Sequence, residues 1–410
     1  MKIRLTPCRP QGTVRAPASK SFDHRLLICA ALTNATSELT IPDTSDDIEA
    51  TAHCLTALGV SIDKHGAEWT VTPPRQWNDG VTLDCGESGS TLRFLLPVVA
   101  ALGLSTTFNG HGKLLERPNK PLLDVMRTHG VSVNNCFPIR VSGKLQPGQY
   151  TIRGDVSSQY ITGLLLALSA LDAPSEIRVI PPVESAPYID ITCDVLHQFG
   201  AAITQSDWTF TVTPAGLHGG HYTVEGDWSN AAALLACGMT VCGLNEVSVQ
   251  GDRAFLEIAA AMGAGVIHED GSFRLVLDGL HGAEIDAAAV PDLVPVLAAL
   301  AATASGTTRI FNAQRLRYKE SDRLQSTANL LNALGGDVSE TDDGLMIHGK
   351  PFLTGCEVDS ANDHRIVMAA AVAAQKSKMP VVIQNAHAID KSFPTFFDLY
   401  RTQGGAADVQ

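Results

Sequence analysis

The chain has 410 residues, of which 45% are hydrophobic, 18% charged and 6% aromatic. This amount of apolar material is enough for large cores and excludes disorder as the main state. At roughly 100–200 residues per domain, the length favours two or three domains. The net charge of −13 disfavours nucleic acid or an anionic membrane as the main partner, so an anionic ligand would need a local basic pocket.

No stretch of the sequence has the length of a membrane span or the form of a signal peptide. The longest apolar stretches, such as residues 294–302, reach about half of the roughly 18 residues that a span requires. Pro10 follows the first residues before an apolar run can develop. The nine cysteines include no Cys-x-x-Cys pair, and the histidines show no ligand spacing. We therefore expect a cytoplasmic protein with reduced thiols and no bound metal.

One pattern of residues occurs six times along the chain. It consists of a glycine, a short alternating strand, a small polar loop and an apolar helix rich in Ala and Leu. The leading glycines are Gly12, Gly80, Gly148, Gly220, Gly282 and Gly355. A second series follows an amphipathic helical run in each repeat, at Gly59, Gly130, Gly200, Gly263, Gly335 and Gly404. Since both series share one period, each repeat is predicted to read β-α-β-α-β-β.

The repeats predict an α/β protein of two similar domains with three repeats each. In the first repeat, the final strands are expected at residues 61–63 and 68–72. The sixth repeat runs out of chain, so the N-terminal strand, residues 2–5, is expected to complete a sheet in the C-terminal half. The predicted domains are residues 1–17 with 226–410, and an inserted domain of residues 18–225. A solenoid is the alternative, disfavoured because the repeats carry different polar residues at one equivalent place.

The loop before the first helix of each repeat carries the residues that suggest a function. Eight to ten residues after the leading glycines, this place is occupied by Lys20, Gly89, Ser158, Ser229, Asp292 and Arg365. A helix start offers unpaired backbone N–H groups and about half a positive charge, so converging starts would form an anion site. Ordinary capping explains Ser229 and Asp227. It does not explain Lys20, Arg25 and Arg365, because cations oppose the helix dipole there and need a compensating anion.

Basic residues gather at a few places in the sequence: Lys20 with Arg25, residues 315–323, His364-Arg365 with Lys391, and Arg117. Arginine forks and lysine point charges suit small substrates with several negative charges. Lys319 and Arg323 are four residues apart and are interpreted as sharing a helical face, although a solvated helix start would also explain the run. Asp292 and Glu320 are the candidates for proton transfer, because a cationic pocket can tune a carboxylate.

A series of short motifs connects these residues to a known family. In chain order they are ASKS (18–21) with Arg25, SDD (45–47), GESGSTLR (86–93), ERP (116–118), SSQ (157–159), PYIDIT (187–192), EGDWSNAA (225–232), KESDR (319–323), NDHR (362–365) and KSFP (391–394). Together they resemble the 3-phosphoshikimate 1-carboxyvinyltransferases, or EPSP synthases, which are enolpyruvyl transferases. The resemblance covers essentially the whole chain.

The resemblance implies a fold and a reaction. The fold would be the enolpyruvyl transferase fold, an inside-out α/β barrel of two domains with a site in the cleft between them. The reaction would transfer the enolpyruvyl group of phosphoenolpyruvate to the 5-hydroxyl of shikimate 3-phosphate, on the route to chorismate and the aromatic amino acids. It would release phosphate through a tetrahedral intermediate, and it would need no metal or organic cofactor. The protein would be a cytoplasmic monomer whose partners are these two small molecules, with no nucleic acid and no membrane.

The resemblance also implies the residues of the site. Those expected to hold shikimate 3-phosphate are Lys20, Ser21, Arg25, Ser157, Ser158, Gln159, Ser185, Tyr188, Asp292 and Lys319. Those expected to hold phosphoenolpyruvate are Lys20, Gly89, Arg117, Gln159, Arg323, Arg365 and Lys391. Glu320 is expected to be the proton donor and Asp292 the base, with Lys20 as a third catalytic residue. A side chain at Gly89 would crowd a ligand that lies on the backbone.

The sequence departs from the family's residue pattern at a few positions, and two alternative functions remain open. Glu87 and Ser90 stand where many family members have Asn and Thr, and Arg315 stands where Asn is common, so Glu87 and Arg315 are left outside the expected site. The related UDP-N-acetylglucosamine enolpyruvyl transferases use a cysteine in the loop before an Arg-Pro pair, and residues 110–118 contain none. The other alternative is a noncatalytic repeat scaffold that binds phosphate at its helix starts.

Overall fold

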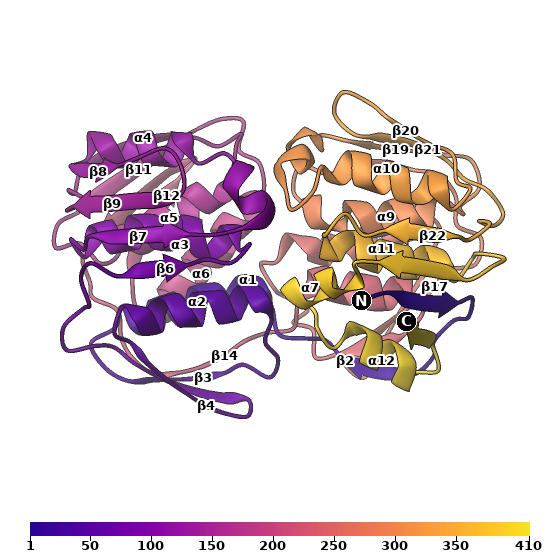
Figure 1. The fold of residues 1–410 in the computed structure, drawn as a ribbon, viewed down its shortest axis with the longest axis horizontal. Helices are drawn as coiled ribbons and strands as arrows, with labels where there is room; N and C mark the ends of the chain where they lie inside the picture. Colours follow the sequence, from indigo (N-terminus) through magenta and orange to yellow (C-terminus); the bar gives the residue numbers. More distant parts are fainter. The chain divides into compact units, whose positions relative to one another are not determined.

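The computed structural model describes residues 1–410, and the chain forms two compact units. The terminal unit consists of Met1–Pro17 with Glu225–Gln410, and the inserted unit consists of Ala18–Val224. Within each unit, helices pack against small sheets (Figure 1). The predicted α/β class is therefore confirmed. None of the helices combines the length and the apolar character that a membrane crossing requires.

The inserted unit contains three repeats. The first comprises α1 (Lys20–Ala31), β3 (Ser37–Thr40), α2 (Asp46–Ala57), β4 (Ser61–His65) and β5 (Glu68–Thr72). The second comprises β6 (Thr82–Asp84), α3 (Gly89–Ala101), β7 (Thr106–Asn109), the 3-10 turn η1 (Gly112–Glu116), α4 (Lys120–Thr128), β8 (Val131–Val133) and β9 (Ile139–Gly143). The third comprises β10 (Gln149–Arg153), α5 (Ser158–Leu168), β11 (Ser175–Ile180), α6 (Ala186–Gln198), β12 (Ala202–Ser206) and β13 (Thr209–Thr213), and β14 (His221–Thr223) follows.

The terminal unit begins with β1 (Ile3–Thr6) and β2 (Thr13–Arg15) and resumes at residue 225. Its first repeat comprises α7 (Trp228–Ala236), β15 (Thr240–Cys242), η2 (Gly251–Ala254), α8 (Phe255–Ala261), β16 (Gly265–Glu269) and β17 (Ser272–Val276). The next comprises β18 (Glu284–Asp286), η3 (Pro291–Leu293), α9 (Val294–Ala301), β19 (Thr307–Phe311), η4 (Gln314–Tyr318), α10 (Arg323–Ala333), β20 (Val338–Glu340) and β21 (Leu345–His348). The last comprises β22 (Glu357–Asp359), α11 (His364–Ala374), β23 (Val381–Gln384), η5 (Ala386–Lys391), α12 (Phe396–Thr402) and β24 (Ala406–Val409).

The first helix of each repeat is buried around nearly its whole circumference. This holds for α1, α3 and α5 in the inserted unit and for α7, α9 and α11 in the terminal unit. A helix that is apolar all round has no face for solvent, so it forms the core and the sheets cover it. The second helices, such as α2, bury one face only. Each unit therefore has helices inside and three separate four-stranded sheets outside.

The sheets combine one parallel pair with antiparallel neighbours. In the sheet β10-β11-β13-β12, β10 and β11 are parallel because α5 crosses over between them. The N-terminal strand β1 lies between β23 and β24, with Ile3 opposite both Ile383 and Val409 (Figure 1). The prediction that the N-terminal strand completes a C-terminal sheet is confirmed.

Two strands, β2 and β14, precede the first helix of a repeat in sequence but pair with strands of another repeat. Both lie just before the chain passes from one unit to the other. β2 pairs in parallel with β15 in the terminal unit, although it directly precedes α1 in sequence. In the inserted unit β14 pairs in parallel with β3, although it directly precedes α7. The contiguous β-α-β-α-β-β reading of these two repeats therefore needs correction. The chain leaves one unit after each strand is laid down, so each strand completes the sheet of the unit that it leaves.

Helices α3 and α5 approach each other closely at Gly163. A Cβ atom added there would lie 2.2 Å from the backbone oxygen of Arg93, so Gly163→Ala would force the two helices apart. We expect a loss of about 1–3 kcal/mol in the free energy of unfolding, as overpacking of a tight core costs. Helix propensity alone would give a gain of about 1 kcal/mol. Urea unfolding followed by tryptophan fluorescence decides between the two signs, and a more stable variant would contradict the close approach.

Candidate active site

In the inserted unit, the starts of three buried helices converge. Lys20, Gly89 and Ser158 are the first residues of α1, α3 and α5, as predicted. The Gln159 Nε2 donates to Ser90 Oγ at 2.9 Å and joins the starts of α5 and α3. Three sets of backbone N–H groups therefore point toward one region, which is favourable for an anion.

Arg25 joins α1 to α5 and α6 from a buried position. Its Nε donates to Thr192 Oγ1 at 2.8 Å, and its Nη2 donates to Thr162 Oγ1 at 3.2 Å and to the Tyr188 carbonyl at 2.9 Å. Its Nη1 donates to the Ser21 carbonyl at 2.5 Å. Burial lowers the pKa of Arg25 to about 10, which still leaves it charged at neutral pH. Most N–H groups of Arg25 therefore donate to other protein groups, and two of these bonds fix the backbone at Ser21 and Tyr188.

The remaining expected residues of the inserted unit occupy helix starts and loops. The Lys20 Nζ lies 2.9 Å from Asp47 Oδ2, which belongs to the SDD motif. Ser157 caps α5 by accepting from the Gln159 backbone N–H. Ser185 precedes α6 with a φ of 54°, a left-handed conformation that is uncommon for a serine.

Gly89 lies directly against the guanidinium of Arg117. A Cβ atom at Gly89 would be 2.7 Å from Arg117 Nη1, so the expected crowding concerns this arginine before any ligand. The buried Arg93 was not among the expected site residues. It donates to Gln159 Oε1 at 2.6 Å and to Asn119 Oδ1 at 3.0 Å, and it thereby fixes both Gln159 and the loop after Arg117. Its position in the GESGSTLR motif was the available signal.

In the terminal unit, Asp292 is the centre of a partly buried ionic group. Its Oδ1 accepts from Lys319 Nζ at 3.3 Å and from Arg323 Nη1 at 2.8 Å, and its Oδ2 lies 3.5 Å from Arg365 Nη2. Burial favours the neutral acid, but the three cations outweigh it and hold the pKa of Asp292 well below its usual range. Asp292 is therefore a carboxylate at neutral pH.

The side chain of Arg323 is only 1% exposed, and three carboxylates pair with it. Besides Asp292, it pairs with Glu320 Oε2 at 2.6 Å and with Asp363 Oδ2 at 2.8 Å. Asp363 also accepts from the backbone N–H of Arg365 and so caps α11. Asp363 was not among the expected site residues, and its place in the NDHR motif gave no indication that it would join two arginines.

The interpretation that Lys319 and Arg323 share a helical face is wrong. Lys319 is the residue after η4, and α10 begins only at Arg323, where Asp322 caps it by accepting from Gln325 N–H. The two cations meet at Asp292 because the intervening residues form a loop. Lys391 lies at the end of η5, and its Nζ donates to the Asn362 carbonyl at 2.8 Å.

Two of the three residues that depart from the family pattern, Arg315 and Glu87, contact other parts of the protein. Arg315 is buried and donates from Nη2 to the Ala288 carbonyl at 2.6 Å. The Glu87 carboxylate lies against Gly112, where an added Cβ would be 2.5 Å from its Cδ. Neither contact involves the carboxylate of Asp292 or the start of α5.

The start of α7 differs from the expectation. Asp227 caps the helix by accepting from Asn230 N–H at 2.7 Å, as predicted. Ser229 is not a cap, because its hydroxyl donates to Asp252 Oδ2 in a buried pair. Burial and the nearby Asp292 carboxylate raise the pKa of Asp252 to about 7, and Asn230 Oδ1 accepts from Arg365 Nη1 at 3.2 Å. Asp252 thus connects α7 electrostatically to the ionic group.

No group of three or more His, Cys, Asp or Glu side chains is arranged to hold a metal ion. All nine cysteines are free.

The raised pKa of Asp252 predicts a particular pH dependence of stability. The folded protein keeps the proton of Asp252 up to about pH 7, whereas the unfolded chain loses it near 3.8, so this contribution is complete below 3.8 and is lost as pH rises through about 7. In Asp252→Asn the contribution is absent. The thermal midpoint of the parent relative to Asp252→Asn should therefore fall between about pH 4 and about pH 7. Parallel profiles for the two proteins would contradict a raised pKa.

Comparison with known proteins assigns a family to this arrangement. The model of the family EPSP synthase (3-phosphoshikimate 1-carboxyvinyltransferase) matches residues 6–399. The 3-phosphoshikimate 1-carboxyvinyltransferase of Clostridium kluyveri is 40% identical, and that of Clostridium novyi is 38% identical, each over 99% of this chain and 98% of the relative.

Solved structures share the fold at lower identity. EPSP synthase from Acinetobacter baumannii matches with a TM-score of 0.83 at 24% identity, covering 100% of this chain and 99% of the other. The enolpyruvyl transferase NikO from Streptomyces tendae matches with a TM-score of 0.81 at 19% identity, covering 99% and 98%. With a family model over almost the whole chain and relatives at this identity, the chain belongs to the EPSP synthase family.

Proposed function

We propose that this chain transfers the enolpyruvyl group of phosphoenolpyruvate to the 5-hydroxyl of shikimate 3-phosphate and releases phosphate. The curated relatives are named for this activity, and this chain matches them over nearly their full length. The observation that carries the proposal is the partly buried group of Lys319, Arg323 and Arg365 around the Asp292 carboxylate. It offers cations for anionic substrates beside a carboxylate that can accept a proton. We further propose that the protein acts as a monomer in the cytoplasm.

Phosphoenolpyruvate carries a phosphate and a carboxylate, and we assign arginines and lysines to both. The proposed residues are Lys20, Gly89, Arg117, Gln159, Arg323, Arg365 and Lys391. Guanidinium forks match these anions in shape as well as in charge. The contact between Gly89 and Arg117 supports the assignment, because a glycine there lets the guanidinium lie against the start of α3.

Shikimate 3-phosphate combines a phosphate with hydroxyl groups, and we assign to it a set of neutral donors and cations. The proposed residues are Lys20, Ser21, Arg25, Ser157, Ser158, Gln159, Ser185, Tyr188, Asp292 and Lys319. The converging starts of α1 and α5 support an anion there. Because Arg25 already holds Ser21 and Tyr188, its first role in this proposal is to position them.

Asp292 is our candidate for the base that removes the proton of the 5-hydroxyl. As it stands, a carboxylate with such a low pKa accepts protons poorly. Substrate phosphate and carboxylate groups would neutralise Lys319, Arg323 and Arg365, which are the groups that hold the pKa down. Binding of the substrates would therefore raise the basicity of Asp292 where it is needed.

Glu320 is our candidate for the acid that protonates C3 of phosphoenolpyruvate. In the addition step the 5-hydroxyl oxygen bonds to C2 while C3 gains a proton, and in the elimination step C3 loses a proton while phosphate leaves C2. The carboxylate of Glu320 now pairs with Arg323. A substrate anion that competes for Arg323 would free Glu320 to carry the proton. Exclusion of water would strengthen these charge contacts and protect the intermediate.

The proposed function is tested by phosphate release from phosphoenolpyruvate in the presence of different acceptors. We expect turnover with shikimate 3-phosphate and none with UDP-N-acetylglucosamine. Turnover with the nucleotide sugar instead would make the chain an enolpyruvyl transferase of the other specificity. Binding of both anions without any phosphate release would make it a noncatalytic scaffold.

The acid and the base are separated by two isosteric variants. Glu320→Gln keeps size and hydrogen-bonding capacity but removes the proton, so both substrates should bind while turnover falls by about 10²–10⁴-fold. Asp292→Asn should slow turnover and also weaken the binding of shikimate 3-phosphate, because the Asp292 carboxylate is proposed to accept a hydrogen bond from the 5-hydroxyl. Substrate titrations together with steady-state rates measure both effects.

Deuterium exchange into the C3 methylene of phosphoenolpyruvate probes protonation directly. Reversible addition scrambles these hydrogens, so exchange should collapse in Glu320→Gln. If this variant exchanged as fast as the parent, Glu320 would not be the acid, and Lys20 or Lys391 would become the candidates.

Gly89→Ala should affect the two substrates differently. The added methyl group would displace the Arg117 guanidinium, which we assign to phosphoenolpyruvate alone. We expect KM for phosphoenolpyruvate to rise by about tenfold or more, as loss of a charged hydrogen bond costs, with little change for shikimate 3-phosphate. Equal losses for both substrates would contradict this placement.

A further inference from the structure

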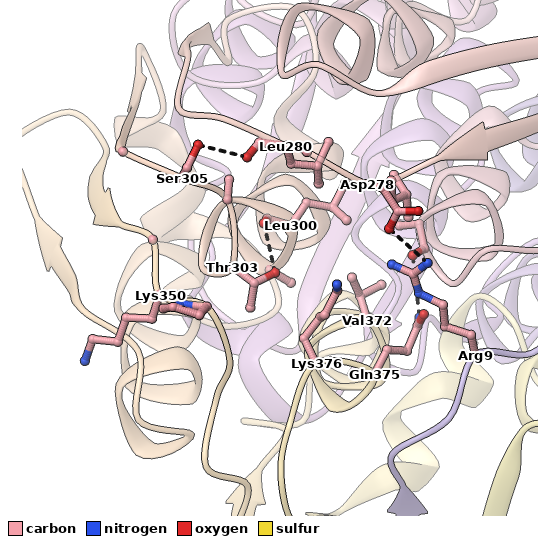
Figure 2. A pocket seen from close by; sticks show the side chains of 18 residues that line it. Arg9, Asp278, Leu280, Leu300, Thr303, Ser305, Lys350, Val372, Gln375 and Lys376 are labelled. Atoms are coloured by element: carbon pink, nitrogen blue, oxygen red, sulfur yellow. Dashed lines mark hydrogen bonds and ion pairs between the residues drawn. The ribbon is translucent and has the colours of Figure 1, made fainter.

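The terminal unit has a cavity at the end of its core that lies away from the ionic group. The cavity has a volume of about 540 Å³ and lies where α7, α9 and α11 end (Figure 2). Asp292 and Arg365 lie at the opposite ends of α9 and α11. With a rise of about 1.5 Å per residue, the eight residues of α9 alone separate the two places by about 12 Å.

The walls of the cavity combine apolar side chains with a few polar groups. Leu277, Leu280, Leu300 and Val372 supply the apolar surface. The hydroxyls of Thr303 and Ser305 and the amide of Gln375 make hydrogen bonds to backbone carbonyls of the lining itself. A cavity of this size that combines apolar side chains with polar and charged groups can take a small molecule that has both characters.

Three cations line the cavity, and they differ in what they do. The Lys350 amine points away and donates to the carbonyls of Gly335 and Gly336, at the end of α10 (Figure 2). Arg9 forms a long ion pair of 3.6 Å with the exposed Asp278. The Lys376 amine is directed toward the Leu300 side of the cavity and makes no hydrogen bond or ion pair (Figure 2).

The inserted unit provides an internal comparison. It has a cavity of about 380 Å³ at the ends of α1, α3 and α5, which is the equivalent place in its own repeats. Pro73, Pro74, Trp77 and Pro214 line this cavity, and its lining contains no lysine or arginine. Helix C-termini favour nearby cations, but the helix ends at this cavity of the inserted unit have no lysine or arginine in its lining. The cations of the terminal unit are therefore not a requirement of the architecture.

We propose that the cavity of the terminal unit binds a small organic anion with an apolar body and a carboxylate that pairs with Lys376. The leucines and Val372 would take the apolar body, and Arg9 would add a second positive charge at the same end. Water now solvates the exposed Lys376 amine, and a carboxylate would replace that water with a charge-assisted hydrogen bond. An uncharged ligand would gain only the apolar contacts.

Isothermal titration calorimetry with 3-phenylpropanoate tests the proposal on the full chain. We expect saturable binding of the carboxylate and at least about tenfold weaker binding of 3-phenylpropanamide, its uncharged counterpart. Lys376→Gln should weaken the binding of 3-phenylpropanoate by at least about tenfold. The matched control is Lys378→Gln, which removes an amine that lies over the Phe352 ring, outside the cavity lining, and should leave binding unchanged.

The variants also separate this site from the reaction. If the probe bound instead at the ionic group around Asp292, Lys376→Gln would bind it as well as the parent, and the proposal would be overturned. It would equally be overturned by the absence of saturation up to about 10 mM, or by equal affinity for the carboxylate and the amide. Thermal midpoints of both variants establish that they are folded. The outcome does not depend on the proposed transfer reaction.

Discussion

Buried cations must have buried partners, and this requirement shapes the terminal unit. Arg323 loses almost all contact with water, and a lone guanidinium there would cost several kcal/mol. Asp292, Glu320 and Asp363 remove that cost, and each of them comes from a different place in the chain. The same contacts lock η3, the loop before α10 and the start of α11 together. A ligand anion that enters this group therefore meets charges that are already oriented, so little free energy is spent on arranging them.

The helix starts explain why the chemistry lies where it does. The first helix of each repeat is mainly apolar and runs through the core, so many of its polar groups lie at its start, while the buried Arg25 and Arg93 lie further inside α1 and α3. The N-terminal ends offer N–H groups to anions, and the carboxylates of Asp227 and Asp363 satisfy some of those groups at α7 and α11. A core made of such helices therefore places most of the assigned residues at or near the helix starts.

The sequence was sufficient to predict the repeat, the class and several element bounds, because these depend on local patterns. The glycine series and the apolar runs predicted helices that begin at Lys20, Gly89 and Ser158, and β5 has the predicted bounds. The exchange of β2 and β14 could not be predicted, since the partner of a strand is chosen by contacts far away in sequence. For the same reason the spacing of Lys319 and Arg323 suggested a helix where there is a loop. Asp252 and Asp363 were missed because a lone carboxylate in a sequence gives no sign of which cation or hydroxyl will face it.

The position of β1 has a consequence for the order of assembly. Within this sequence β1 is synthesised before all other strands, but both of its neighbours, β23 and β24, are synthesised after all the others. Its hydrogen-bonding edges must therefore remain unpaired until these two strands are made, whereas the inserted unit is continuous and can assemble during synthesis. Contacts between opposite ends of a chain slow folding, because the entropy of closing the loop is lost before any contact is gained. The sheet β22-β23-β1-β24 of the terminal unit can therefore form only after the inserted unit has been synthesised.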